Sequence, residues 1–252
     1  MPDRRRTSLT YSKRSLHGQV AHDIGGRILR GDLAPGAVLP NEADFSARLR
    51  VSRTALREAI KVLAAKGLVE SRPKTGTRVR PRQSWNLLDP DVLAWQREGA
   101  PPAPFLRKLT EVRRIVEPAA AELAAQRVTA RELAGMEDAF RTMEAALTGR
   151  EPDFESFDLA DMRFHRAILE GCHNDILEQM SGVVFGALLV SFRATSRLPG
   201  AAKGSLPKHR AILDAIRAKD PRRAAQAMKR LVGSTAREID ASLKRPGRRR
   251  SR

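Results

Sequence analysis

The stretch Val51-Ser52-Arg53-Thr54-Ala55-Leu56-Arg57-Glu58-Ala59-Ile60-Lys61 decides how the N-terminal part of this chain is read. Ser52 is a favourable N-cap, and the apolar positions after it recur at three- and four-residue steps, which predicts one buried helical face. Arg53, Arg57 and Lys61 fall on another face, with no carboxylate at the intervening four-residue steps. Such a cationic stripe suits phosphates and base edges, although a solvated basic face has the same pattern.

The segments on either side of this stretch predict a winged helix-turn-helix over residues 15–80. A first helix is expected over 16–29, and Asn41 caps a short helix over 42–49, directly before the basic one. After Gly67, two strand-like segments flank Pro73-Lys74-Thr75-Gly76, which predicts a β-hairpin with a basic tip.

The positive charge of the chain is concentrated in this N-terminal module. Residues 1–82 hold 18 Lys/Arg against 7 Asp/Glu, residues 83–243 hold 23 against 22, and residues 244–252 hold six basic groups. A basic module on a nearly neutral body is typical of nucleic-acid binding, where counterion release from phosphates dominates affinity. A membrane surface is a weaker match, because the module has few aromatic residues.

Cysteine usage and hydropathy exclude several classes of protein. The single cysteine, Cys172, rules out an intramolecular disulfide and a Cys-rich zinc finger. No apolar run approaches the roughly 20 residues that span a bilayer, and no signal-type segment follows the charged start. We therefore expect a cytoplasmic protein with no membrane partner.

Ordered motifs in the first 80 residues resemble the winged helix of GntR-type transcription regulators. They are Leu39-Pro40-Asn41-Glu42, residues 51–59, Gly67-Leu68-Val69, and Gly76-Thr77 with Val79. The resemblance implies that the recognition helix and the wing tip contact operator DNA. Together with the basic stripe, it gives these expected DNA contacts: Arg53, Thr54, Arg57, Lys61, Lys74, Thr75, Gly76 and Thr77.

The remainder of the chain predicts an all-helical bundle. We expect a linker at 81–88, a helical effector-binding and dimerisation domain at 89–243, and disordered basic ends at 1–14 and 244–252. A Thr129/Glu132 capping box opens one helix, and Pro118 is expected to kink another. The expected longer helices are 105–127, 129–147, 154–172, 174–197, 205–219 and 221–243.

Three side chains in the bundle form a candidate metal site. Asp161 and His165 lie four residues apart, hence on one helical face, and His209 lies on a later apolar helix. One carboxylate and two imidazoles suit a divalent ion such as zinc, nickel or manganese. Spacing alone favours a plainer interpretation, an Asp-His surface pair with an unrelated histidine.

The bundle also resembles the FCD ligand domain of the FadR-like subfamily, through Asp161, His165, Asn174, residues 209–216, Asp220 and Ala227-Met228. That resemblance implies a metal held by Asp161, His165 and His209, although the usual fourth ligand position falls at Leu231. Further matches, among them residues 85–89 and 116–118, resemble members that control sugar-acid use, galactonate included. They imply a carboxylate effector. Arg113 is the first candidate to bind its carboxylate through two hydrogen bonds, and Arg193 is the second.

The combined expectation is a homodimeric operator-binding repressor that a sugar acid releases from DNA. Activation in place of repression stays open, because sequence does not fix the sign of the coupling. One alternative is a regulator of the same fold that senses another carboxylate, a fatty acyl group or the metal itself. A metal-dependent hydrolase is a further alternative, although no His-Glu-x-x-His motif is present.

Overall fold

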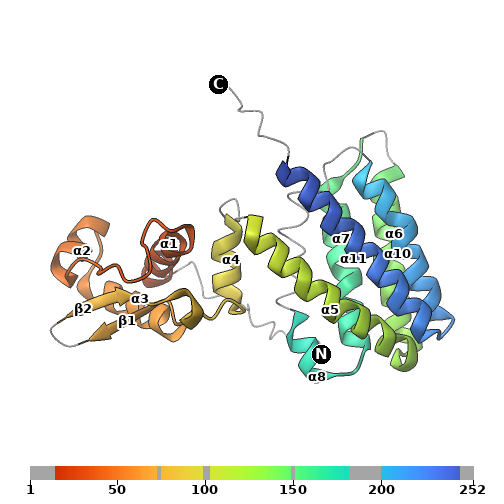
Figure 1. The fold of residues 1–252 in the computed structure, drawn as a ribbon, viewed down its shortest axis with the longest axis horizontal. Coiled ribbons are helices and arrows are strands. Elements are labelled where there is room, and N and C mark those ends of the chain that lie inside the picture. The colour runs from red at the N-terminus through yellow and green to blue at the C-terminus, as the bar shows by residue number, and fades with distance from the viewer. Residues whose placement is uncertain (1–14, 73–74, 99–102, 149–150, 182–199, 245–252) are drawn as a thin grey trace. The chain divides into compact units, whose positions relative to one another are not determined.

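The structure, a computed structural model, describes residues 15–72, 75–98, 103–148, 151–181 and 200–244. They belong to two compact units, Met1–Ala100 and Pro101–Arg252, which are described separately (Figure 1). Of the ends expected to be disordered, 1–14 and 244–252, residues 1–14 and 245–252 lie outside the described residues, while Lys244 is the last residue of a helix. No described helix combines the length and the apolar character that crossing a membrane requires.

The first unit is the expected helix-turn-helix. Its helices are α1 (Leu16–Arg30), α2 (Glu42–Leu49) and α3 (Arg53–Ala65). The turn between α2 and α3 is tight, because Arg50 adopts a left-handed conformation with φ of 54°. Ser52 then caps α3 by accepting a hydrogen bond from the backbone N–H of Ala55 at 3.1 Å.

A two-stranded wing follows, with β1 (Val69–Arg72) antiparallel to β2 (Gly76–Val79). Val69 stands opposite Val79 in the pairing register. The connection before α2 holds the wing from its other side, since the Leu39 N–H donates to the Thr77 carbonyl at 2.8 Å. The wing is therefore hydrogen-bonded to the segment that leads into α2, and it closes the core of the unit.

The segment predicted as a linker, 81–88, packs on the first unit, and so does the helix after it. It contains a 3-10 turn (Arg82–Ser84) and leads into α4 (Pro90–Glu98). Trp85 and Trp95 are buried in the same core as α1 and α3. The sequence placed residues from 89 onward in the second domain, whereas these contacts assign α4 to the first unit.

A buried ion-pair cluster fixes this connection to the end of the recognition helix. Lys66, the C-terminal cap of α3, places its Nζ 2.8 Å from Asp89 and 2.6 Å from Asp91. The next residue, Gly67, has φ of +72°, and a Cβ there would lie 2.2 Å from the Ser84 carbonyl oxygen. Only glycine fits this position without displacing the backbone.

The second unit is a helical bundle, which confirms the predicted fold class. Its described helices are α5 (Ala103–Arg127), α6 (Ala130–Thr148), α7 (Phe154–Gly171), α8 (Asp175–Gln179), α10 (Ala201–Arg217) and α11 (Pro221–Lys244). Helix α11 packs against α5 and α10, while α7 packs against α6 and α5. Figure 1 shows α5, α7, α10 and α11 running alongside one another around a shared core.

Several expected boundaries in the bundle shift by a few residues. Helix α10 begins at Ala201 and runs through Pro207, whereas the sequence predicted a start at residue 205. Helix α5 continues through Pro118. Of the helix expected over 174–197, the structure describes α8, which ends at Gln179 with Met180 as its cap, and residues 182–197 lie outside the described part of the chain. The predicted capping box is present, because Thr129 N–H donates to Glu132 Oε2 at 2.9 Å.

Candidate DNA-binding face and buried ligand cluster

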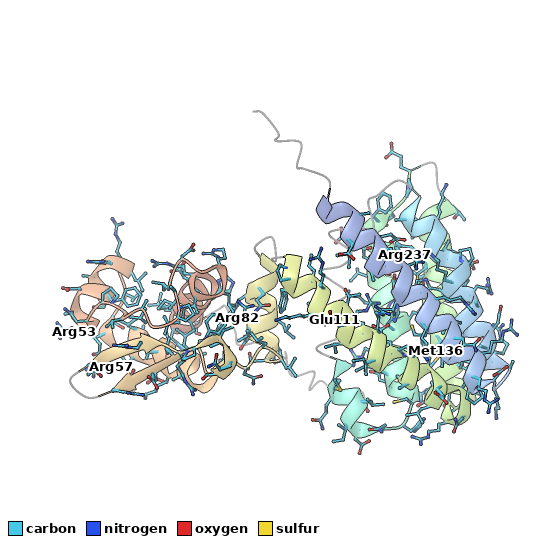
Figure 2. The ribbon with its side chains drawn as sticks, viewed as in Figure 1. Arg53, Arg57, Arg82, Glu111, Met136 and Arg237 are labelled. Carbon is cyan, nitrogen blue, oxygen red and sulfur yellow. The ribbon has the colours of Figure 1, made fainter. Side chains whose placement is uncertain are left out.

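The exposed face of α3 carries the predicted recognition residues. Arg53, Thr54, Arg57 and Lys61 are all exposed, and Figure 2 shows Arg53 and Arg57 among the side chains of the first unit. Arg57 Nε lies 2.7 Å from Glu42 of α2, with side chains 64% and 49% exposed. Ion pairs this exposed contribute about 0–1 kcal/mol, so a phosphate can replace the carboxylate.

Lys61 is also paired, with Glu58 at 2.9 Å one turn away. Glu58 lies three residues from Lys61, so four-residue spacing alone predicts a stripe without this carboxylate. In the folded chain, Arg53 has no ion pair with a described residue. Arg57 and Lys61 each form an exposed ion pair whose carboxylate a phosphate can replace. The net positive potential of this face is thus lower than the sequence suggested.

The wing tip presents the remaining predicted contacts. Thr75 and Gly76 are exposed, and Gly76 has φ of +78°, a conformation that favours glycine. Thr77 is half-buried, and its hydroxyl lies 2.8 Å from that of Ser71 across the two strands. Lys74 lies outside the described residues.

The bundle brings Asp161, His165 and His209 together. Helix α7 carries Asp161 and His165, and helix α10 carries His209. Asp161 Oδ1 lies 3.2 Å from His165 Nε2 and 3.4 Å from His209 Nε2. All three side chains are buried, and one possible ligand atom from each lies within 4.8 Å of the others. The predicted juxtaposition is therefore present, and the surface-pair interpretation does not apply.

The two imidazole rings are held so that both Nε2 atoms face the carboxylate. His209 Nδ1 hydrogen-bonds the Ser205 carbonyl at 3.0 Å, which places the proton on Nδ1. His165 Nδ1 lies 2.8 Å from Glu117 Oε2 of α5. With protons on both Nδ1 atoms, three electron-pair donors converge on one point. A cation, either a proton or a metal ion, is needed between them.

Glu117 is a further member of this cluster, and it was not predicted from the sequence. Its carboxylate joins His165 to Arg113, whose Nε donates to Glu117 Oε1 at 2.5 Å. Both side chains of this pair are almost completely buried, at 3% and 2% exposure. The four-residue spacing of Arg113 and Glu117 within an apolar helix was visible in the sequence. The contact with His165 was not visible, because it joins two different helices.

Arg113 is therefore engaged inside the protein and not free in an open pocket. Its Nη2 lies 3.4 Å from Glu117 Oε2, so two nitrogens face the same carboxylate. Arg193, the second predicted effector contact, lies outside the described residues. Leu231, at the position where the resemblance expects a fourth metal ligand, is buried in the apolar core and supplies no ligand atom.

Burial and charge act in opposite directions on this cluster. Burial disfavours the Glu117 carboxylate, but Arg113 and His165 outweigh it and lower its pKa to about 2. Burial likewise opposes ionisation of Asp161, yet His209 and His165 hold its pKa well below the usual range. Burial lowers the pKa of His165, and Glu117 with Asp161 more than compensates, raising it to about 9. Without a metal, the cluster retains a proton.

The geometry also fits a divalent ion. Metal–ligand bonds to histidine and carboxylate are about 2.0–2.2 Å long, which places neighbouring ligand atoms roughly 3–3.5 Å apart. The separations of 3.2 and 3.4 Å fall in that range. Asp161 Oδ1, His165 Nδ1 and His209 Nε2 all lack a partner with hydrogen-bond geometry among the described residues, although His165 Nδ1 lies within ion-pair distance of Glu117. A carboxylate behind a ligating histidine, as Glu117 stands behind His165, orients such ligands in metalloproteins.

Comparison with known proteins covers both units. The family described as "Bacterial regulatory proteins, gntR family" matches residues 16–79, and the FCD domain matches residues 108–234. The galactonate operon transcriptional repressor of Escherichia coli (strain K12) is 36% identical over 221 residues, 86% of this chain and 93% of that protein. The putative L-lactate dehydrogenase operon regulatory protein of the same organism is 32% identical over 246 residues, 93% of this chain and 92% of that protein.

Among solved structures, a Listeria monocytogenes protein, Lar, aligns with a TM-score of 0.65 at 18% identity. That alignment covers 92% of this chain and 99% of Lar, and at this identity it supports the fold alone. The two matched domains and the relatives, which are regulators and not enzymes, exclude the hydrolase alternative. The chain belongs to the GntR family of bacterial transcription regulators, with an FCD domain as its helical unit.

Proposed function

We propose that this regulator acts as a homodimeric repressor whose operator affinity falls when a sugar acid and a divalent metal ion occupy the FCD domain. The observation that carries the proposal is the buried convergence of Asp161, His165 and His209 on one point. A purely structural core rarely buries a carboxylate and two imidazoles side by side, because each of them loses its hydration. A binding role accounts for that unfavourable arrangement.

The metal would be held by Asp161 Oδ1 and the Nε2 atoms of His165 and His209. Because Leu231 leaves the fourth position without a protein ligand, coordination positions remain for water or effector oxygens. A bound divalent ion would supply an electrophilic centre that attracts anionic oxygen ligands. The protein's own contribution is orientation, since Glu117 and the Ser205 carbonyl fix the two rings.

The proposed effector class is a 2-hydroxycarboxylate, with galactonate as the first candidate. The names of two relatives refer to a galactonate operon and to an L-lactate dehydrogenase operon. Galactonate and lactate both carry a carboxylate with a hydroxyl on the adjacent carbon, a pair that can chelate one cation. The shared chemistry is therefore a chelating acid, and the length of its polyol chain would set specificity.

Arg113 would contact the effector acid with only part of its guanidinium group. Its Nε and Nη2 face Glu117, and no hydrogen bond of Nη1 to a described residue is found. An effector carboxylate could use that remaining donor while Glu117 keeps Arg113 in place. The role is thus a shared contact, in contrast to the free bidentate clasp expected from the sequence.

Release from DNA would follow from a population shift between two dimer arrangements. Each protomer supplies one α3 helix, and two half-sites are read together only when their spacing fits. An effector that binds one arrangement more tightly lowers the population of the other by its differential affinity. The helical unit would thereby control the recognition residues Arg53, Thr54 and Arg57.

The test uses a duplex selected from random DNA by the full-length protein, followed by fluorescence anisotropy. D-galactonate with nickel or zinc is expected to raise the apparent Kd for DNA, and chelation should remove this effect. Asp161→Asn should abolish the response while preserving DNA binding, whereas Asp138→Asn, in an exposed ion pair with Arg141, should respond normally. The proposal fails if no 2-hydroxy acid changes DNA affinity. Release by metal alone would favour the metal-sensing alternative.

A further inference from the structure

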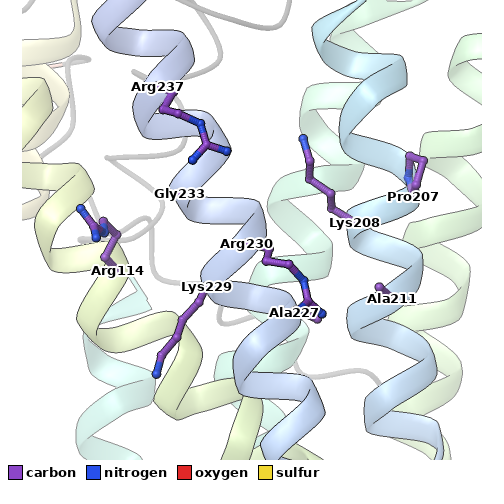
Figure 3. Close-up of a pocket in the computed structure, with 9 residues that line it drawn as sticks. All are labelled: Arg114, Pro207, Lys208, Ala211, Ala227, Lys229, Arg230, Gly233 and Arg237. Carbon is purple, nitrogen blue, oxygen red and sulfur yellow. The ribbon is translucent and has the colours of Figure 1, made fainter.

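A second, cationic groove lies on the outer side of the bundle, between α10 and α11 and beside α5 (Figure 3). Its volume is about 620 Å³, within the range of roughly 300–1,000 Å³ common for small-molecule sites. Five cations line it: Arg114, Lys208, Lys229, Arg230 and Arg237. None of the nine lining residues is acidic.

None of these five cations forms an ion pair with a described residue. Some other cations on the same helices are paired: Arg107 with Asp240 on α11, and Arg210 of α10 with Glu144. On α11, Arg222 and Arg223 also have no ion pair with a described residue, so the groove is distinguished by the gathering of five such cations around one volume. Several unpaired cations around one concave volume attract an anion strongly, because their fields add there.

The nearest carboxylate only partly offsets this charge. Glu238 interacts with Lys208 and Arg237, but no direct ion pair joins them. Burial raises the pKa of Glu238 despite both cations. Glu238 is not one of the lining residues, so it does not occupy the space between the cations.

The floor of the groove is small and apolar. Ala211, Ala227 and Gly233 contribute to its lining, together with Pro207 at one end (Figure 3). A Cβ added at Gly233 would meet no atom within 4 Å, so the space above this residue is open. Small apolar groups below and cations around them suit a ligand with a compact carbon skeleton and charged ends.

We propose that this groove binds a small organic phosphate carrying two phosphate groups, as a second ligand site of the regulator. A monocarboxylate carries one negative charge, whereas two phosphates carry about three to four at neutral pH, which is closer to the five cations of the groove. The site is separate from the buried cluster, although helices α5 and α10 contribute residues to both. Arg114 follows Arg113, and Lys208 precedes His209, so a ligand outside would touch helices that hold the inner site.

The experiment is calorimetric titration of the full-length protein with fructose 1,6-bisphosphate and with inorganic pyrophosphate. Sulfate at equal ionic strength serves as the reference. Both phosphates are expected to bind, and the bisphosphate should bind more tightly because only it can cover the apolar floor. Lys208→Gln combined with Arg230→Gln should weaken binding at least about tenfold, since each charge-assisted contact is worth that much. Arg131→Gln, an exposed cation on α6, is the matched charge control.

A steric variant gives an independent test. Gly233→Leu fills the groove and should abolish bisphosphate binding, while helix propensity favours its folding. Gly135→Leu on α6, where an added Cβ also meets nothing within 4 Å, is the control and should bind normally. If both groove variants bound the phosphates with unchanged affinity, the ligand would be assigned to the basic DNA-binding unit and the proposal would be wrong. Sulfate binding as tight as bisphosphate binding would also overturn it. Galactonate responses should persist in the groove variants, which separates this proposal from the first.

Discussion

Replacing Glu117 by glutamine should destabilise the helical unit more than any single surface substitution. The variant keeps the size and shape of the side chain but leaves the Arg113 charge buried, at 3% side-chain exposure, without a counter-charge. Breaking a buried ion pair in this way costs about 3–5 kcal/mol. The fall of the Glu117 pKa from 4.5 to about 2 gives a consistent estimate of about 3 kcal/mol. In melting temperature this corresponds to a loss of roughly 10 °C.

The assay is differential scanning calorimetry of the full-length chain, followed over a pH series. Because the folded pKa of Glu117 lies below its unfolded value of 4.5, its stabilisation is fully present above pH 4.5 and is lost as pH falls toward 2. The difference between wild type and Glu117→Gln should therefore shrink over that interval. Glu137→Gln, which removes an ion pair with Arg217 at 45% and 33% exposure, should cost less than about 1 kcal/mol.

A double variant separates charge from packing. Arg113→Met with Glu117→Leu removes both buried charges, and most of the lost stability should return, because no unpaired ion remains in the core. A loss below about 1 kcal/mol in Glu117→Gln would refute the reasoning, since it would mean that Arg113 reaches water or another partner. If the double variant did not regain stability, the loss in Glu117→Gln would be due to the lost contact with His165 or to altered packing.

Three further outcomes test other parts of the chain. Arg57→Ala should weaken binding to the selected duplex by about tenfold or more while leaving calorimetric unfolding unchanged, because the side chain is exposed; retained sequence-specific affinity would contradict its assignment. Gly67→Ala should lower the melting temperature of the DNA-binding unit, because its Cβ would clash with the Ser84 carbonyl, and an unchanged transition would be inconsistent with that geometry. Leu231→His should tighten nickel binding in calorimetry if the FCD resemblance identifies the fourth ligand position correctly.

The helices could be predicted from local signals because their boundaries depend on neighbours in sequence. Asn41 and Ser52 cap the helices that they were predicted to cap, each through its own side chain. The placement of α4 could not be predicted in this way. It depends on Trp95, which packs so close to α1 that a Cβ on Gly25 would lie 2.4 Å from its ring. No local pattern distinguishes that contact from packing against the second unit.

The buried cluster was predictable only where its members share a helix. The four-residue spacing predicted Asp161 beside His165, and the same spacing of Arg113 and Glu117 was present in the sequence but no pair was predicted from it. The links between α5, α7 and α10 depend on helix packing, which sequence periodicity does not determine. For the same reason the Arg57–Glu42 pair was missed, since it joins two helices across a turn.

The packing of α4 constrains how a signal can reach the recognition helix. Lys66 caps α3 and holds both Asp89 and Asp91 at the start of α4 through buried ion pairs. The Lys66 ammonium also lies 5.7 Å from the ring centroid of Trp95, which is a residue of α4. Separating α4 from α3 would break these ion pairs and leave buried charges without partners, at a cost of several kcal/mol. Helix α4 is therefore expected to move with the DNA-binding unit as one body.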